Sequence, residues 1–132
     1  MTTINSVLGP IDSSQLGFTL MHEHVMIAAS GLSTHYPDLL GPNKEQRAIN
    51  ALTKAKAEGI DSMLDATTFD LGRDPALLKT VSKASGVNLI NVTGWWLDVP
   101  RFLQGVGPNQ MADEFIKDLT DGFRGTDIKA GM

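Results

Sequence analysis

The chain has 132 residues, of which 42% are hydrophobic and 20% are charged, so its composition is that of a folded globular domain rather than a disordered chain. A formal net charge of −4 gives no basic surface for nucleic acid or an anionic membrane. The absence of cysteine excludes disulfides and thiolate metal sites, and it fits a reducing compartment, so we expect a cytoplasmic protein. No apolar run approaches the length of a membrane span, and the first ten residues do not resemble a signal peptide.

Strand-like and helical segments alternate along the chain. A small hairpin is predicted first, at residues 3–16, with its turn at Gly9-Pro10. Four strand-like runs follow: GFTLMHEHV at 17–25, DSMLDAT at 61–67, VNLINVT at 87–93 and the shorter IKAGM at 128–132. Such alternation indicates βαβ units and a parallel sheet, so we predict a single α/β domain.

Three helices are predicted between these strands. The first covers residues 44–58, with Asn43 as its cap and Gly59 at its end. The second begins at Asp74-Pro75, a cap followed by proline at the first helical position, and stops at Gly86. The third runs from after Asn109 to Gly122. The apolar stripes are Leu77, Val81 and Ala84 in the second helix, and Met111, Phe115 and Leu119 in the third.

Two of the three histidines stand in the first strand-like run, separated only by Glu23. On a helix, residues two apart point about 200° away from each other, so His22 and His24 could not share a ligand. On a strand they face the same side, together with Leu20. Two imidazoles one pleat apart can bind one metal ion such as zinc, iron, cobalt or manganese.

The alternative is that these histidines are hydrogen-bonded core residues, since His-X-His alone is a weak pattern. The HExxH motif of helical zinc sites is absent. The position of the pair favours metal binding, because active sites in parallel α/β folds lie at the carboxyl ends of the strands, where His22 and His24 are expected.

The stretch GPIDSSQLGFTLMHEHV resembles the N-terminal signature of the phosphotriesterase family within the amidohydrolase superfamily. Three later stretches agree with it in order and spacing: DATTFDLGRDPALL at 65–78, NVTGWW at 91–96 and GFRGTDIKAG at 122–131. The resemblance implies a (β/α)₈ TIM barrel with two divalent metals at its carboxyl end, zinc above all, and a homodimer. It also implies hydrolysis of small organophosphate, ester or lactone substrates by a hydroxide shared between the metals.

In that family the His-X-His pair binds the more buried metal, which corresponds to His22 and His24 here. The remaining ligands are a carboxylated lysine on strand 4, histidines on strands 5 and 6 and a late aspartate. A complete barrel takes about 250 residues, and Lys129 matches a variable position rather than the bridging lysine. We therefore expect residues 1–132 to be a partial domain, about strands 1–4 of the barrel, that has no catalytic residues beyond the two metal ligands and no activity on its own.

Further residues have competing interpretations. Trp96 matches a family position that lines the substrate pocket, or else packs in the core, whereas Trp95 is expected to be structural. Asp65 has two interpretations. It either accepts a hydrogen bond from a metal-binding histidine without touching the metal itself, or it caps the turn at Thr67 and Thr68. His35 lies in the long irregular segment 28–43, a candidate binding loop or lid, and is expected to be solvated.

Two hypotheses follow from the sequence. The first is a metal-dependent hydrolase of ester bonds, phosphotriester or lactone. The second is a non-catalytic half-barrel that self-associates or completes a barrel with another chain. Under either hypothesis the inner face of the sheet is expected to include Phe18, Leu20, Leu89 and Ile90.

Overall fold

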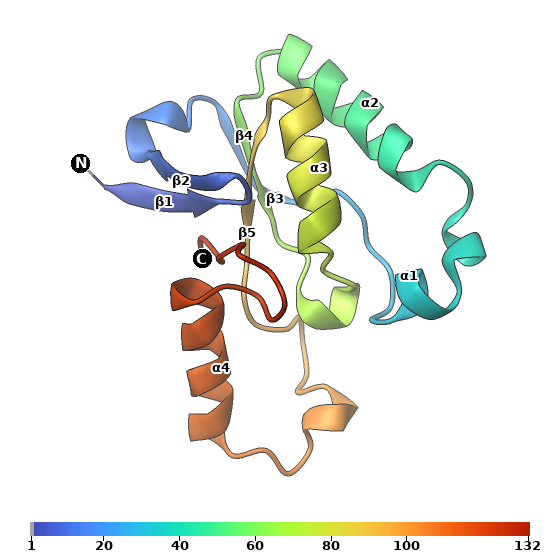
Figure 1. Ribbon diagram of the computed structural model, residues 1–132, viewed down its shortest axis with the longest axis vertical. Coiled ribbons are helices and arrows are strands. Elements are labelled where there is room, and N and C mark those ends of the chain that lie inside the picture. The colour runs from blue at the N-terminus through green and yellow to red at the C-terminus, as the bar shows by residue number, and fades with distance from the viewer. Residues whose placement is uncertain (1) are drawn as a thin grey trace.

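A computed structural model describes residues 2–132 as an α/β fold around a three-stranded parallel sheet (Figure 1). The strands lie in the order β3 (Thr19–Glu23), β4 (Ser62–Asp65) and β5 (Asn88–Asn91). α2 (Lys44–Ala57) connects β3 to β4, and α3 (Pro75–Ser85) connects β4 to β5. The predicted parallel βα units are therefore confirmed. Within residues 2–132, no strand pairs with the outer edge of β3.

The two crossover helices begin in different ways. At α3, the Asp74 carboxylate accepts the Leu77 N–H at 3.0 Å and Pro75 occupies the first turn, as predicted. Gly86 ends the helix in the left-handed conformation, with φ 73°. At α2, Asn43 holds the cap position, but its backbone is left-handed and its side chain makes no capping hydrogen bond. The predicted cap position is therefore confirmed, but Asn43 does not satisfy the helix end through its side chain.

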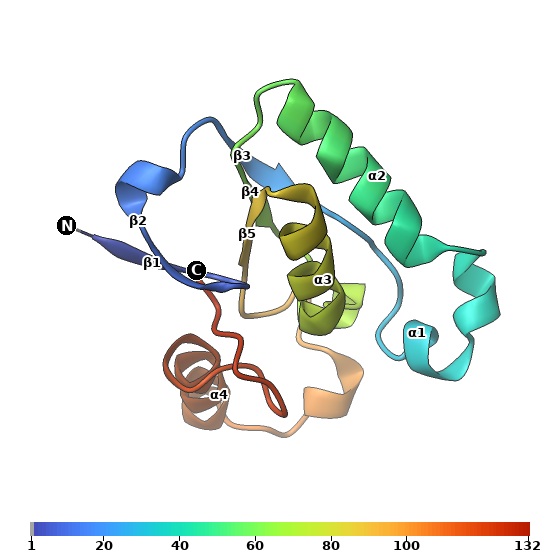
Figure 2. The same cartoon turned by 45° about the horizontal axis from the view of Figure 1, so that its top comes forward.

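One face of the sheet is covered by α2 and α3, which lie side by side (Figure 2). Leu77 and Val81 are buried there as predicted, but Ala84 is exposed and Leu78 is buried instead. Leu89 of β5 is 0% exposed at the centre of this core. The buried members of the cluster are Val7, Ala48, Leu52, Met63, Leu77, Leu78, Val81, Val87, Leu89, Phe123, Ile128 and Ala130.

The opposite face of the sheet has a smaller apolar cluster. It consists of Leu64, Ile90 and Val92, with Ile4 and Leu16 packed against it. The predicted grouping of Phe18, Leu20, Leu89 and Ile90 on this face is wrong. Neighbouring strand residues point to opposite faces, so Leu89 lies under the helices while Ile90 does not. Leu20 packs against the helix-covered core, and Phe18 is exposed.

The N-terminal hairpin consists of β1 (Thr3–Ser6) and β2 (Gly9–Asp12). Ser6 pairs with Gly9, so the turn is Val7-Leu8 and not the predicted Gly9-Pro10. Val7 is buried, and its N–H donates to Leu89 O at 2.9 Å. Burial of this apolar turn residue against the edge of β5 outweighs the turn preference of the Gly-Pro pair.

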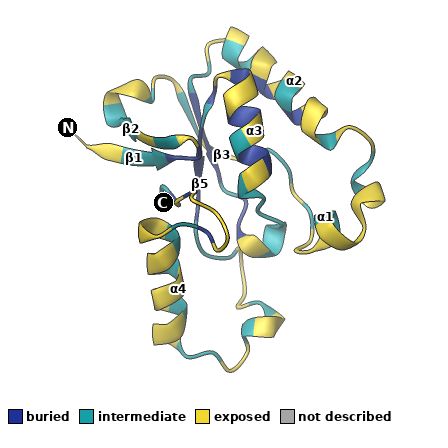
Figure 3. Cartoon of the chain, in the orientation of Figure 1, coloured by how far each residue is buried: buried dark blue, intermediate teal, exposed yellow. Residues whose placement is uncertain are grey.

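The C-terminal part leaves the sheet and returns to it. α4 (Pro108–Thr120) is largely exposed, and Met111, Phe115 and Leu119 are not buried as predicted, because α4 packs on the loop after β5 and not on the sheet (Figure 3). Residues 128–132 do not form the predicted strand, although Gly131 N–H donates to Asn91 O at 2.9 Å, which holds them beside β5. None of the helices within residues 2–132 has the length and apolar character to cross a membrane.

Candidate functional site

His22 and His24 lie at the carboxyl end of β3 with their rings next to each other. The ring centroids are 5.4 Å apart and the planes are inclined by 78°. The register of β3 shifts between Leu20, which pairs with Met63, and Glu23, which pairs with Asp65, so two residues of β3 stand opposite Leu64. A bulge of this kind changes the direction of side chains and is common beside active sites. The predicted proximity of the rings is observed, but through a bulge and not through plain alternation with Leu20.

His24 is held by a residue of the neighbouring strand's loop. Its Nδ1 lies 3.0 Å from Thr67 Oγ1, and the ring is half-buried, whereas His22 is exposed. A histidine with Nδ1 engaged in a hydrogen bond presents Nε2 as its free nitrogen. Sequence reasoning missed this role of Thr67. The available signal was its place two residues after Asp65, just past the carboxyl end of a buried strand.

Asp65 is the last residue of β4 and is 1% exposed. Its Oδ1 accepts the Thr67 N–H at 2.9 Å, so it stabilises the turn, as one of the two predictions had it. Burial raises the pKa of the Asp65 carboxyl, against the effect of hydrogen bonds from Thr67 and from the Val25 N–H and of nearby His24. Its link to His24 passes through Thr67 and not through a direct contact.

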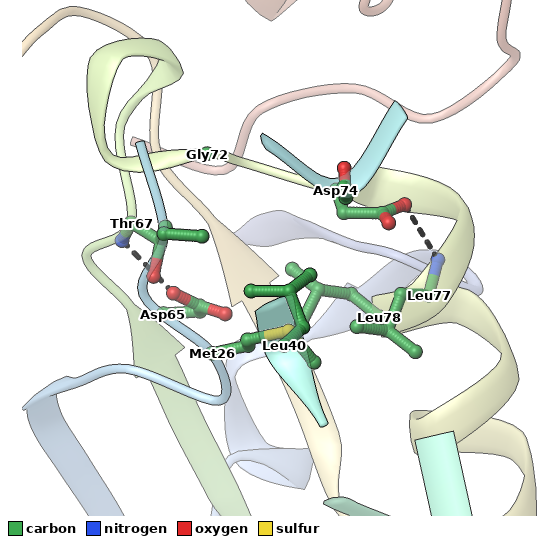
Figure 4. Close-up of a pocket in the computed structure, with 10 residues that line it drawn as sticks. Met26, Leu40, Asp65, Thr67, Gly72, Asp74, Leu77 and Leu78 are labelled. Carbon is green, nitrogen blue, oxygen red and sulfur yellow. Dashed lines mark hydrogen bonds between the residues drawn. The ribbon is translucent and has the colours of Figure 1, made fainter. Parts of the chain in front are cut away.

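A small cavity lies behind Asp65 and Thr67 (Figure 4). Its volume of about 10 Å³ is room for about one water molecule, which excludes a substrate. Met26, Leu40 and Leu78 form part of its apolar wall. The polar pair Asp65 and Thr67 is therefore backed by apolar side chains with almost no space for solvent.

Asn91 ends β5 and pairs in register with Asp65 on β4. It is completely buried, and within residues 2–132 its side-chain nitrogen and oxygen have no hydrogen-bond partner. An unpaired buried amide is unfavourable by about 1–3 kcal/mol. Two adjacent strands thus end in buried polar side chains at the edge of the sheet where the histidines lie.

Trp96 lies in the loop after β5 and is 68% exposed. Its backbone N–H donates to both carboxylate oxygens of Asp70, at 3.0 and 3.3 Å, and the Thr68 hydroxyl donates to the same carboxylate at 2.6 Å. The backbone oxygen of Asp70 accepts the Ser30 N–H from the loop after β3. Asp70 therefore connects the loops that follow all three strands, a role that sequence reasoning did not find. The ring of Trp96 is not part of the core.

The other candidate residues from the sequence lie outside the histidine site. Trp95 packs against Phe115 of α4, with ring centroids 4.7 Å apart, as expected of a structural residue. His35 ends α1 (Leu32–His35) in the segment 28–43 and is exposed. Lys129 is exposed as well. The segment 28–43, expected to be irregular, contains α1 and a short 3₁₀ helix at Pro37–Leu40.

Arg73 joins the loop after β4 to α4. Its Nη1 donates to Val92 O at 2.8 Å, its Nη2 lies 3.2 Å from Asp118 Oδ2, and its guanidinium stacks 4.0 Å from the centroid of Phe123. Burial lowers the pKa of Arg73, and the charge of Asp118 opposes that shift. The contacts of this arginine are structural.

The imidazoles of His22 and His24 could supply two ligands of a metal ion. Within residues 2–132, no group of three or more histidine, aspartate, glutamate or cysteine side chains converges on one point. His22 and His24 therefore form a two-imidazole set, and neutral imidazole is a good ligand for zinc and similar ions. The free Nε2 of His24 fits that chemistry.

Comparison with known proteins identifies the family of this chain. A sequence model of the phosphotriesterase family matches residues 2–132. The chain belongs to the phosphotriesterase family. The family resemblance expected from the sequence motifs is thereby confirmed over nearly the whole chain.

Proteins similar to this chain have names that point to different activities. A phosphotriesterase homology protein of Mycobacterium tuberculosis is 36% identical over 143 residues, covering 100% of this chain and 44% of the relative. An aryldialkylphosphatase of Saccharolobus solfataricus is also 36% identical, over 92% of this chain and 40% of the relative. An N-acetyltaurine hydrolase of Xenopus tropicalis is 29% identical, over 98% of this chain and 46% of the relative. The chain thus spans less than half the length of these relatives.

Proposed function

We propose that this chain is part of a metal-dependent hydrolase of the phosphotriesterase type, in which His22 and His24 bind one of two divalent metals. The observation that carries the proposal is the pair of imidazoles 5.4 Å apart at the carboxyl end of β3, in a chain of this family. Zinc suits these ligands best, with iron, cobalt and manganese as alternatives. When bound, the two metals lower the pKa of water and polarise the P=O or C=O group that is attacked.

The proposed fold is the N-terminal part of a (β/α)₈ barrel, about strands 1–4. The face of the sheet opposite α2 and α3 supports this, because it has an apolar cluster and bears a hollow of about 140 Å³ lined by Leu64, Ile90 and Met21. The inner wall of a closed barrel is a packed apolar surface of this kind. The remaining metal ligands belong to the rest of the barrel, so residues 1–132 alone are not expected to hydrolyse substrate.

The proposed substrates are phosphotriesters or lactones. The aryldialkylphosphatase relative supports the phosphotriester, and the exposed ring of Trp96 offers an apolar surface for an aryl or acyl group. A second candidate is an amide of an N-acyl amine, which the N-acetyltaurine hydrolase relatives favour. Phosphoryl, ester and amide centres all present an oxygen that a metal can polarise, so the loops after the strands decide among them.

Metal binding tests the proposal without requiring turnover. Zinc bound per chain is measured by equilibrium dialysis for the parent protein, for His22→Ala, for His24→Ala and for the double variant. His35→Ala is the matched control, because it removes the third histidine from an exposed position in α1. We expect the site variants to lose zinc and the control to keep it. Retention of zinc by the double variant would contradict the assignment. The substrate is identified by measuring the hydrolysis of a phosphotriester, a lactone and an N-acyl amide by a protein that contains the complete barrel.

A further inference from the structure

We propose that Asp70 is a positioning residue, which sets where Trp96 lies for substrate by holding the backbone of that tryptophan. The Trp96 N–H donates to both oxygens of the Asp70 carboxylate, at 3.0 and 3.3 Å, across 26 residues of sequence. A hydrogen bond to a charged acceptor is stronger than one between neutral groups. The inference rests on the proposed function in one respect, namely that the ring of Trp96 contacts the substrate.

The segment that carries Trp96 has few other contacts that fix its path. Residues 94–99 contain no helix or strand, and within residues 2–132 the Trp96 N–H is the one group of this segment that forms a hydrogen bond. The ring of Trp95 packs on Phe115, with centroids 4.7 Å apart, which holds the preceding residue. Because Trp96 is exposed, the place of its ring depends on its backbone more than on packing.

Asp70 is itself held in place by the loop after β4. The buried Thr68 donates its hydroxyl proton to Asp70 Oδ1 at 2.6 Å. The same loop is attached to the segment after β3, because the Ala28 N–H donates to Leu71 O at 3.0 Å. Gly72 lies so close to this segment that a Cβ there would be 2.6 Å from Ala28 O. The carboxylate is therefore supported from two neighbouring segments.

The loop that Asp70 holds is at the edge of the sheet where the candidate metal ligands lie. Parallel strands have their carboxyl ends at one edge, so the segment after β5 begins at the same edge as His22 and His24. A group that binds substrate there has to be held close to its productive position, because small displacements weaken both binding and catalysis. Loss of the Asp70 carboxylate is therefore expected to weaken the binding of substrates that contact Trp96.

Amide hydrogen exchange measures how firmly the loop is held, and it requires neither metal nor turnover. It is read residue by residue by NMR in a protein that contains the complete barrel. In the parent, the Trp96 N–H should exchange slowly. The N–H of the exposed Leu97, which has no hydrogen-bond partner in the described part of the chain, should exchange rapidly.

Variants of Asp70 test which group gives the protection. Asp70→Ala should accelerate exchange at Trp96 by about 10- to 100-fold, as expected for the loss of a hydrogen bond to a charged group. Asp70→Asn keeps an oxygen that accepts the N–H, so it should retain most of the protection. Asp98→Ala is the matched control, because it removes an exposed carboxylate of the same loop that accepts no hydrogen bond from residues 2–132.

Steady-state kinetics on the same proteins tests whether the held position serves the substrate. Asp70→Ala is expected to raise KM, with kcat and zinc content nearly unchanged, and Asp70→Asn should stay near the parent KM. The Asp70→Ala change made in a Trp96→Ala background is expected to have little further effect on KM, since the ring that Asp70 positions is gone. A merely structural role of Asp70 would raise KM equally in both backgrounds.

The inference is overturned by rapid exchange of the Trp96 N–H in the parent, by unchanged exchange in folded Asp70→Ala, or by equal KM effects in the two backgrounds. If Asp70→Ala does not fold, Asp70→Ser takes its place in both measurements, because its shorter, uncharged side chain is a weaker acceptor. A KM unaffected by Trp96→Ala overturns the substrate contact of Trp96 and this inference with it, while zinc binding through His22 and His24 is unaffected. Full zinc binding without the two histidines overturns the metal site instead, and the hydrogen-exchange result remains valid.

Discussion

Replacing Asp118 with alanine tests a buried ion pair that helps to attach α4 to the rest of the fold. The Asp118 carboxylate lies against Arg73 and accepts the Thr93 hydroxyl at 2.6 Å. The side chains of Arg73 and Asp118 are only 10% and 19% exposed. The variant therefore leaves a largely buried guanidinium without its counter-ion, although the hydrogen bond from Arg73 to Val92 O persists.

The expected loss of stability lies between two limits. Removing one partner of a fully buried ion pair is destabilising by about 3–5 kcal/mol, whereas exposed pairs contribute about 0–1 kcal/mol. Asp118 retains some contact with solvent, so we expect a decrease of about 2–3 kcal/mol in the free energy of unfolding. That is a large part of the roughly 5–15 kcal/mol of a typical domain.

Urea unfolding followed by circular dichroism measures this loss as a lower midpoint. Asp127→Ala is the matched control, because the Lys79–Asp127 pair has 44% and 82% exposed side chains and its loss should hardly change the midpoint. The Asp118→Ala change is then repeated in an Arg73→Met background, where the guanidinium is gone. Equal effects of Asp118→Ala and Asp127→Ala would refute the reasoning, and so would an undiminished effect of Asp118→Ala in the Arg73→Met background.

Two further predictions concern the site and the dependence of stability on pH. In a protein that contains the complete barrel, Trp96→Ala is expected to raise KM and to change substrate preference without loss of zinc, because the ring is exposed. Loss of zinc or unfolding of the variant would show that Trp96 is structural instead. Lys56 and the Phe18 N–H lower the pKa of Asp61 below its ordinary value of 3.8. Its stabilising effect is therefore complete above pH 3.8 and is lost as the pH falls through the folded-state pKa. Urea midpoints of the parent and of Asp61→Asn should converge on acidification, and a constant difference down to about pH 2.5 would contradict this.

The sequence predicts the ends of a helix best where a single residue type determines each end. Asp74, Pro75 and Gly86 specify both ends of α3 through a cap, a fixed φ and a left-handed residue, all readable from residue type. The hairpin turn was misplaced, because burial of Val7 against β5 is a long-range effect. The packing of α4 was also misjudged, since periodicity indicates an apolar stripe without saying what lies opposite it.

The candidate site was predictable only in part. The spacing of His22 and His24 indicates adjacent side chains on a strand, and the rings are adjacent. The bulge that places them depends on the pairing of β3 with β4, which the sequence of one strand does not contain. Thr67 is two residues past Asp65 along the chain but 43 residues from His24, so its contact with the histidine requires the fold.

The position of Asp70 bears on how such a site can be altered. Its carboxylate holds the Trp96 N–H, and its backbone oxygen holds the Ser30 N–H, so the segments after β3, β4 and β5 share one anchor. Grafting a foreign loop in place of the one that carries Trp96 therefore has to supply an N–H at the same point, or the other two segments lose their common support. The three segments are therefore expected to tolerate replacement only together, whereas an exposed side chain such as Trp96 can be exchanged without disturbing this support.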